Sequence, residues 1–178
     1  GAYAPAPVPY GAAELVGTFV QPILDHFADA GTPYVGVLFA GLMLTADGPR
    51  LVEYNVRFGD PEAQAILPLL DGDLAAIAVA ATQARLADAD VMIRPGASCT
   101  VVAAAAGYPA DPRAGDEVSV PTDEQLDGAL LFPAGIADGR TAGGRVLAVT
   151  GLGDDLGAAR ANAYAAIEQV SFAGMQYR

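Results

Sequence analysis

Residues 50–62 read R-L-V-E-Y-N-V-R-F-G-D-P-E, and this stretch predicts a β-strand, a sharp turn and the start of a helix. Side chains alternate between the two faces of a strand, so the odd-numbered residues are expected on one face and the even-numbered residues on the other. The first face would carry Leu51, Glu53, Asn55 and Arg57, and the second Val52, Tyr54, Val56 and Phe58. The strand therefore presents a carboxylate, a carboxamide and a guanidinium side by side.

The residues before this stretch predict its partner strand and a helix. The apolar run from Tyr34 to Thr45 is followed by Asp47-Gly48, a turn dipeptide, so the two runs form a predicted β-hairpin. Further upstream, residues 12–30 have apolar side chains at helical spacing. Pro22 is expected to kink that helix, because proline lacks a backbone N–H.

The residues after the stretch complete an α+β fold. Two helices are expected over residues 62–70 and 73–87, the second capped by Asp73, and residues 88–97 have the composition of a domain boundary. Strands are then expected over 98–105, 117–120, 129–136 and 145–150, with a last helix over 154–169. The predicted domains are 1–90 and 91–178, the second rich in β-structure.

Composition excludes several classes of protein and site. The net charge of −12 argues against a nucleic-acid-binding protein, which needs clustered cations. All nine basic residues are arginine, so no lysine nucleophile or phosphate-loop lysine is available in this chain. One cysteine, Cys99, and one histidine, His26, cannot build a disulfide or a zinc site. Apolar runs are too short to cross a membrane, and we expect a reducing compartment.

The odd-numbered face offers a metal site. Mg²⁺ prefers oxygen ligands and commonly takes only one or two from protein, with phosphates and waters completing its shell. Glu53 and Asn55 supply two such ligands, and Arg57 on the same face could pair with a phosphate or a developing anion. The alternative is a solvated polar face on which Glu53 and Arg57 form a weak surface pair. The residues alone leave both possibilities open.

Longer motifs resemble one family. Residues 53–64, E-Y-N-V-R-F-G-D-P-E-A-Q, resemble the E-x-N-x-R-F-G-D-P-E-x-Q signature of phosphoribosylamine–glycine ligases, which are ATP-grasp enzymes of purine biosynthesis. Residues 1–8, G-A-Y-A-P-A-P-V, and residues 34–43, Y-V-G-V-L-F-A-G-L-M, resemble two further segments of that family. In the C-terminal half, matching segments occur at residues 107–109, 143–147, 149–153 and 172–178. The resemblance therefore covers the whole chain.

This resemblance implies a fold and a reaction. The chain would be the second part of an ATP-grasp domain followed by a small β-rich C-terminal domain. The family uses ATP to phosphorylate glycine, and 5-phosphoribosylamine then displaces phosphate to give glycinamide ribonucleotide. By similarity, Glu53 and Asn55 would bind Mg²⁺ or Mn²⁺, Asn55 and Arg57 would contact the nucleotide, and Arg57 would be catalytic. A cytoplasmic location follows, with neither nucleic acid nor membrane as a partner.

The chain also departs from the family. The family's N-terminal domain and first ATP-grasp segment, with their phosphate-binding lysines, are not present, so activity would need that missing N-terminal part. Residues 132–136 read F-P-A-G-I where relatives commonly have F-H-A-G-T, so Pro133 and Ile136 replace a histidine and a hydroxyl.

Other residues have simpler explanations. His26 and Cys99 are expected to be structural, Asp71-Gly72-Asp73 a turn and cap, and Gly143-Gly144-Arg145 either a turn or an anion cradle. Two other functions remain open. One is a different ATP-grasp carboxylate–amine ligase or a carboxylase, and the other is a non-catalytic interaction domain.

Overall fold

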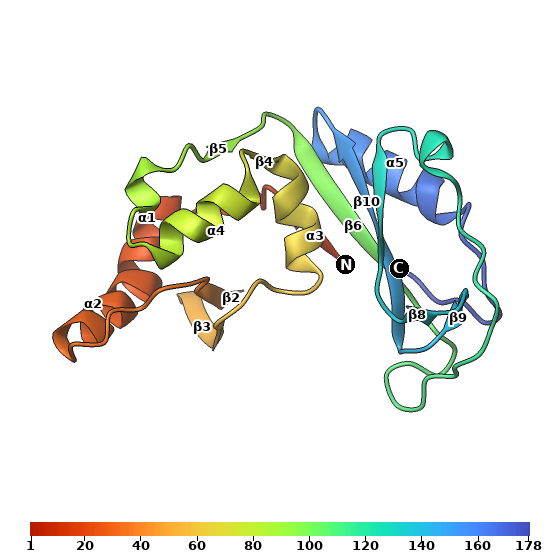
Figure 1. Cartoon of the computed structure of the whole chain (residues 1–178), viewed down its shortest axis with the longest axis horizontal. Helices are drawn as coiled ribbons and strands as arrows, with labels where there is room; N and C mark the ends of the chain where they lie inside the picture. Colours follow the sequence, from red (N-terminus) through yellow and green to blue (C-terminus); the bar gives the residue numbers. More distant parts are fainter. The chain divides into compact units, whose positions relative to one another are not determined.

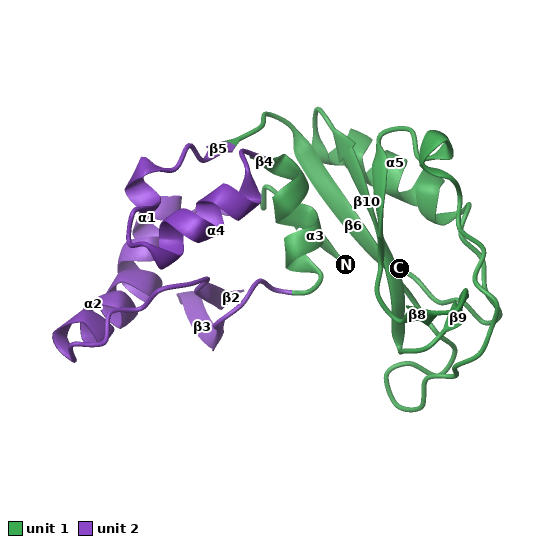
Figure 2. Ribbon diagram, in the orientation of Figure 1, with its two compact units in different colours: residues 1–6, 60–70, 93–178 green, residues 7–59, 71–92 purple.

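The computed structural model describes all 178 residues and divides into two compact units (Figures 1 and 2). The first comprises residues 1–6, 60–70 and 93–178, and the second comprises residues 7–59 and 71–92. Both contain helices and strands, so the predicted α+β class is confirmed. None of the helices is both long enough and apolar enough to span a membrane.

The first unit is built on a four-stranded antiparallel sheet of order β1-β6-β10-β7. Its strands are β1 (Ala2–Ala4), β6 (Ala97–Ala104), β7 (Ala129–Pro133) and β10 (Arg145–Gly153). Two short strands, β8 (Ile136–Ala137) and β9 (Arg140–Thr141), form a separate ribbon. β6 and β10 are buried along most of their length, as expected for central strands.

Two helices cover opposite faces of this sheet. Helix α5 (Leu156–Ile167) packs its alanines against the face that carries Val101, Leu147 and Val149, which form the core. Helix α3 (Glu62–Ile66) lies on the other face, where Ser98 Oγ donates to the Ala65 carbonyl at 2.6 Å. Alternation along β6 explains the division, since Ser98 and Val101 point to opposite sides.

The second unit contains a helical segment, a hairpin and a further helix. The helical segment runs through α1 (Ala12–Leu15), a π-helical turn (Val16–Val20) and α2 (Gln21–Asp29). The hairpin pairs β2 (Phe39–Thr45) with β3 (Gly48–Asn55). Helix α4 (Leu74–Thr82) follows, and Asp73 caps it, as predicted, by accepting from the amides of Ala75 and Ala76. The two-residue strands β4 (Leu70–Asp71) and β5 (Met92–Ile93) each have one residue in this unit and one in the first unit.

Two prolines and one alanine with a positive φ explain several departures from the predicted helices. Pro22 lies in the first turn of α2, directly after the π-helical turn, so the expected kink takes the form of a widened turn. Pro68 lies in the 3₁₀ turn Leu67–Leu69, and α3 ends before it rather than continuing to residue 70. Helix α4 ends at Thr82, and Ala84 has a positive φ of 54°, which stops the helix short of residue 87.

Two strand predictions were also wrong, and one strand was missed. Residues 117–120 form no regular strand, because only Glu117 and Ser119 make isolated bridges. The single strand expected over 129–136 is divided into β7 and β8. Residues 2–4, for which no strand was predicted, form β1, which pairs with β6.

The compact units are not continuous in sequence, unlike the expected domains 1–90 and 91–178. Residues 1–6 belong to the first unit because β1 extends its sheet, and residues 60–70 belong there because α3 covers that sheet. A break near residue 92 is common to both descriptions. The domain division itself stays a prediction.

Candidate functional site

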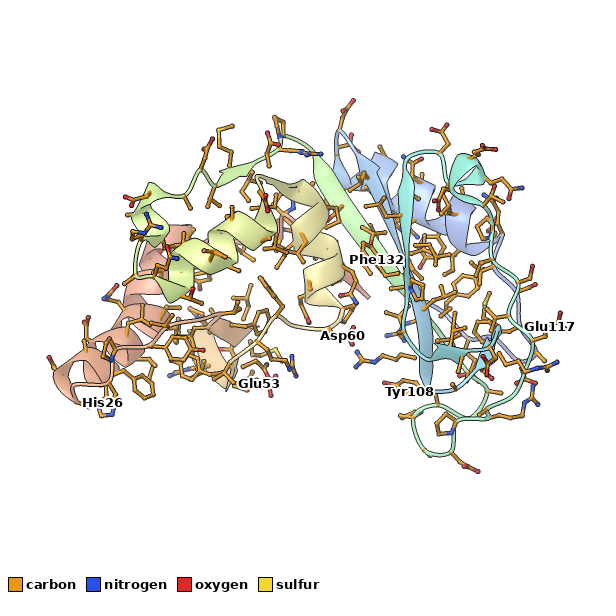
Figure 3. All side chains as sticks on the ribbon, viewed as in Figure 1. His26, Glu53, Asp60, Tyr108, Glu117 and Phe132 are labelled. Carbon is orange, nitrogen blue, oxygen red and sulfur yellow. The ribbon has the colours of Figure 1, made fainter.

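The end of strand β3 brings two oxygen-bearing side chains together. Asn55 Nδ2 donates to Glu53 Oε1 at 2.8 Å, so the carboxamide and the carboxylate are in direct contact. Glu53 is exposed and Asn55 is half-buried, and Figure 3 shows Glu53 on the hairpin. Their spacing of two residues on a strand places both on the same face, as the sequence predicted.

The partner strand leaves room for Glu53. Gly41 on β2 lies opposite Glu53 in the hairpin register. A Cβ atom at position 41 would lie 3.3 Å from Glu53 Cγ, closer than an ordinary contact. Glycine at this position therefore lets the Glu53 side chain lie across the neighbouring strand.

A β-bulge interrupts the face that the sequence predicted. Gly41 pairs with Glu53 and Leu42 pairs with Leu51, so Val52 has no partner in β2. An extra residue in one strand breaks the alternation of side chains. The simple odd-numbered face is therefore wrong between Leu51 and Glu53, although Glu53 and Asn55 remain together. Alternation could not reveal this, because the bulge depends on pairing with β2.

Tyr54 fixes the strand from its other face. Its hydroxyl donates to the Phe19 carbonyl in the π-helical turn, 35 residues away in the sequence. This bond holds the strand segment between Glu53 and Asn55 against the helical part of the same unit.

Arg57 lies beyond the end of β3, in a bend rather than in the strand. Its Nη1 donates to the Phe58 carbonyl at 2.8 Å, and its side chain is exposed. The expectation that Arg57 continues the strand face is therefore wrong, because pairing with β2 stops at Asn55. A guanidinium has five N–H donors, so the contact with Phe58 leaves others available for an anion.

The donor set fits a hard divalent cation. No group of three or more His, Cys, Asp or Glu side chains in the chain could hold a metal ion by itself. Any bound metal would therefore take few ligands from this chain. Glu53 and Asn55 provide two neighbouring oxygen donors, which suits Mg²⁺ or Mn²⁺ completed by phosphates and water.

The Gly59–Pro61 turn is held by an arginine that the sequence did not single out for this purpose. Arg145 Nη1 donates to the Asp60 carbonyl at 2.7 Å, and Arg145 Nη2 lies 3.2 Å from Asp60 Oδ2. The 85 residues that separate the two explain why no local pattern indicated the contact. The G-G-R motif was the available signal. It was considered only as a turn or an anion cradle.

The glycines of that motif serve close packing. A Cβ atom at Gly144 would lie 2.4 Å from Cδ2 of Tyr108, and one at Gly135 would lie 2.8 Å from the Cα of Gly143. The loop before β10 therefore passes tightly over the Tyr108 ring. Arg145 and Tyr108, with Pro61 and Gln176 among others, line a cavity of about 680 Å³ within the first unit.

The remaining residues that the sequence analysis named take no part in the contacts described above. His26 is exposed and makes an edge contact with Phe27, with ring centroids 5.8 Å apart. Cys99 is half-buried on β6, and burial raises the pKa of its thiol above the usual value, while Arg160 and the N-terminus lower it by less. Pro133 ends β7 opposite Leu147, and Ile136 starts β8.

Two family models match most of the chain. Residues 1–63 match the ATP-grasp (A) domain of phosphoribosylglycinamide synthetase, and residues 98–178 match the C domain of the same enzyme. This chain belongs to the phosphoribosylamine–glycine ligase family. It corresponds to a C-terminal portion of the enzymes of that family, as the resemblance in sequence predicted.

Individual relatives agree with this assignment. A phosphoribosylamine–glycine ligase from Brucella melitensis is 42% identical over the whole chain, which spans 43% of that protein. A bifunctional purine biosynthetic protein from Schizosaccharomyces pombe is 46% identical, and the chain spans 23% of it. The chain thus spans less than half the length of these relatives.

Solved structures show the same fold. The phosphoribosylamine–glycine ligase of Thermotoga maritima matches with a TM-score of 0.79 and 34% identity, covering 99% of this chain and 44% of that one. The biotin carboxylase domain of Hydrogenobacter thermophilus 2-oxoglutarate carboxylase matches with a TM-score of 0.66 at 13% identity, covering 98% of this chain and 39% of that one. The second likeness shows only a shared ATP-grasp fold, so the comparisons favour the ligase family over a carboxylase.

Proposed function

We propose that this chain supplies the metal-binding strand and the C-terminal domain of a phosphoribosylamine–glycine ligase. In the proposed reaction, the glycine carboxylate attacks the γ-phosphorus of ATP, giving glycyl phosphate and ADP. The amine of 5-phosphoribosylamine then attacks the acyl carbon and displaces phosphate, giving glycinamide ribonucleotide. The observation that carries the proposal is the direct contact of Glu53 and Asn55 on β3, within the signature stretch of the family.

Glu53 and Asn55 are the proposed ligands of Mg²⁺ or Mn²⁺. A divalent cation held by these oxygens would neutralise negative charge on the phosphates of ATP. The chain has a net charge of −12 and would otherwise repel such an anionic substrate. Gly41 contributes by leaving the Glu53 side chain space beside β2.

Arg57 is the proposed catalytic residue, and with Asn55 it would contact the nucleotide. Its guanidinium is exposed and uses one donor on the neighbouring Phe58 carbonyl, so further donors can reach a phosphate or the acyl phosphate. Stabilising charge that develops during transfer lowers the barrier, which is the usual role of arginine in phosphoryl transfer.

The proposed activity belongs to a longer protein. The chain spans 43% of the Brucella relative, and it contains no lysine for nucleotide phosphates. We therefore propose that the rest of the ATP-grasp domain, the N-terminal domain and most of the ATP site come from residues outside this sequence. A cytoplasmic location accompanies this proposal, because the named relatives are biosynthetic enzymes.

The metal ligands can be tested by substitution in the protein that carries this chain. Glu53→Gln keeps the size of the side chain and removes its charge. We expect the Mg²⁺ concentration for half-maximal ADP formation to rise by about 10-fold or more, since lesser changes around metal sites cost 10- to 100-fold in affinity. Glu14→Gln, an exposed glutamate in the same unit, is the control. An unchanged Mg²⁺ dependence in Glu53→Gln would show that Glu53 is not a ligand.

The activity itself needs a mass measurement and an assay on the same sample. The intact mass of the native protein is compared with the 18.0 kDa of this chain. ADP formation is then measured with glycine and 5-phosphoribosylamine, and with each omitted. A larger protein that forms ADP only when both are present supports the proposal. A larger, folded protein that forms none under any metal condition contradicts it.

A further inference from the structure

Arg145 makes two different contacts with one residue of the signature stretch. Its Nη1 donates to the main-chain carbonyl of Asp60, and its Nη2 is paired with the Asp60 carboxylate. Figure 3 shows Asp60 at the N-terminal end of α3, and Arg145 begins β10 of the same unit. One guanidinium thus restrains both the backbone and the side chain of Asp60.

Asp60 is also joined to the sheet by a second route. Gln64 Nε2 donates to Asp60 Oδ1 at 3.2 Å, and the Gln64 carbonyl accepts from Thr150 Oγ1 at 3.0 Å. Thr150 is fully buried and lies 2.8 Å from the Thr100 hydroxyl. Gln64 Oε1 is buried without a partner, so the contact with Asp60 is the one hydrogen bond of that carboxamide. Arg145 and Thr150, both on β10, therefore each hold a residue in or next to the turn.

Stability is a poor explanation for the Arg145 contact. The Arg145 and Asp60 side chains are 40% and 52% exposed, and exposed ion pairs contribute little to folding. A restraint on position needs no large contribution to stability. Such a restraint requires only that the Arg145–Asp60 pair favour one conformation of the Gly59–Pro61 turn.

We propose that Arg145 is a positioning residue, which acts through Asp60 to fix the Gly59–Pro61 turn. This inference rests on the proposed function, because the turn follows Arg57 by two residues and is covalently continuous with it. Freedom at Asp60 is transmitted along the backbone to Arg57. Misplacement of a catalytic group by about 1 Å can cost about 100-fold in rate.

The chain contains a matched control for this idea. Arg113 Nε pairs with Asp116 Oδ2 at 2.7 Å, and Arg113 Nη2 donates to the Ala173 carbonyl at 3.0 Å. Arg113 thus has the same two kinds of partner, a carboxylate and a main-chain carbonyl, in the same unit. Its side-chain hydrogen bonds and ion pair involve no residue of 53–64. Arg113→Gln therefore removes equivalent bonds without affecting the turn.

The first experiment compares Arg145→Gln with Arg113→Gln in the protein that carries this chain. For Arg145→Gln we expect kcat to fall about 10- to 100-fold, with the KM for ATP and glycine changed by less than about threefold, because the lost positioning acts in the transition state. Arg113→Gln should keep kcat within about twofold. Arg145→Lys, which retains the charge but not the two-point contact, should recover part of the loss.

A double-mutant cycle identifies Asp60 as the route. If Arg145 acts through Asp60, Arg145→Gln and Asp60→Asn together should reduce kcat no further than Arg145→Gln alone, within about twofold. Arg113→Gln combined with Asp60→Asn should instead show the product of the two separate effects. Multiplicative effects for the Arg145 and Asp60 pair would overturn the proposed route.

Hydrogen exchange tests the positioning independently of activity. In Arg145→Gln, amides in residues 57–64 should exchange about fivefold faster, while Arg113→Gln leaves them unchanged. Unchanged exchange in Arg145→Gln refutes the restraint. Faster exchange with normal kcat in an active enzyme refutes its catalytic use. A wild-type protein without ligase activity refutes the proposed function instead, and exchange still decides whether Arg145 holds the turn.

Discussion

Replacing Gly151 by alanine should destabilise the sheet of the first unit strongly. Gly151 lies in β10 where α5 crosses the strand, and a Cβ atom there would lie 2.2 Å from both the Ala159 carbonyl oxygen and the Ala163 nitrogen. Ordinary contacts begin at 3.4 Å, so the overlap is about 1.2 Å. Both atoms are helix backbone. Relief therefore requires α5 to move as a whole.

The expected cost follows from this geometry. Inserting a group into a packed core typically costs about 1–3 kcal/mol, and a clash with backbone on two sides places this substitution at about 3 kcal/mol. For a protein of this size, that corresponds to a fall of about 6–12 °C in Tm. The buried alanines Ala159, Ala163 and Ala166 would lose contact with the strand as the helix moves outward.

The assay is thermal unfolding with hydrogen exchange of residues 156–167 as a local readout. Gly17→Ala is the control, because position 17 is helical, exposed and has no atom within 4 Å of an added Cβ. Alanine is preferred to glycine in helices, so Gly17→Ala should leave the free energy of unfolding unchanged or raise it by up to about 1 kcal/mol, without lowering Tm. A Gly151→Ala variant with unchanged Tm and unchanged exchange in α5 would refute the close-packing argument.

Two further predictions concern Cys99 and Asp73. Because burial raises the pKa of the Cys99 thiol, the folded state holds its proton more tightly than the unfolded state. The free energy of unfolding should therefore decrease as pH rises above the usual thiol range. Iodoacetamide should also alkylate Cys99 more slowly in the native protein than in urea, as measured by mass spectrometry. Equal alkylation rates would contradict the burial of Cys99. Asp73→Ala should lower the stability of α4 by about 1 kcal/mol, because two amide hydrogen bonds of 2.8 and 3.1 Å are lost. Asp73→Asn, which keeps the accepting oxygen, should lose less in the same urea titration.

Local chemistry explains which elements could be predicted from the sequence. The turn residues Asp47 and Gly48 and the flanking apolar runs predicted the hairpin, and the position of Asp73 before an apolar run predicted a helix cap. Proline marked two interruptions, at residues 22 and 68, although only the first was anticipated. These features depend on neighbours within a few residues, so a single sequence contains the information.

The candidate site contains both features that the sequence predicted and features that it did not. The residue types and their two-residue spacing were enough to bring Glu53 and Asn55 together, because alternation is a property of any strand. The bulge at Val52 was not predictable, since it exists only in the register with β2. The same holds for Arg57, whose departure from the strand is set by where pairing with Phe39 ends.

The sequence by itself determined the family, the α+β class and the neighbouring oxygen donors of Glu53 and Asn55. Each of these depends on short motifs, whose residues lie within a few positions of one another. Only the tertiary structure decided that β1 and α3 belong with the C-terminal sheet and that Arg145 restrains Asp60. The contacts of β1 and of Arg145 join residues 85 or more positions apart, and the Ser98–Ala65 contact of α3 joins residues 33 positions apart. The packing of the sheet decides which residues β1, α3 and Arg145 contact, and the spacing of residues within a motif does not predict these contacts.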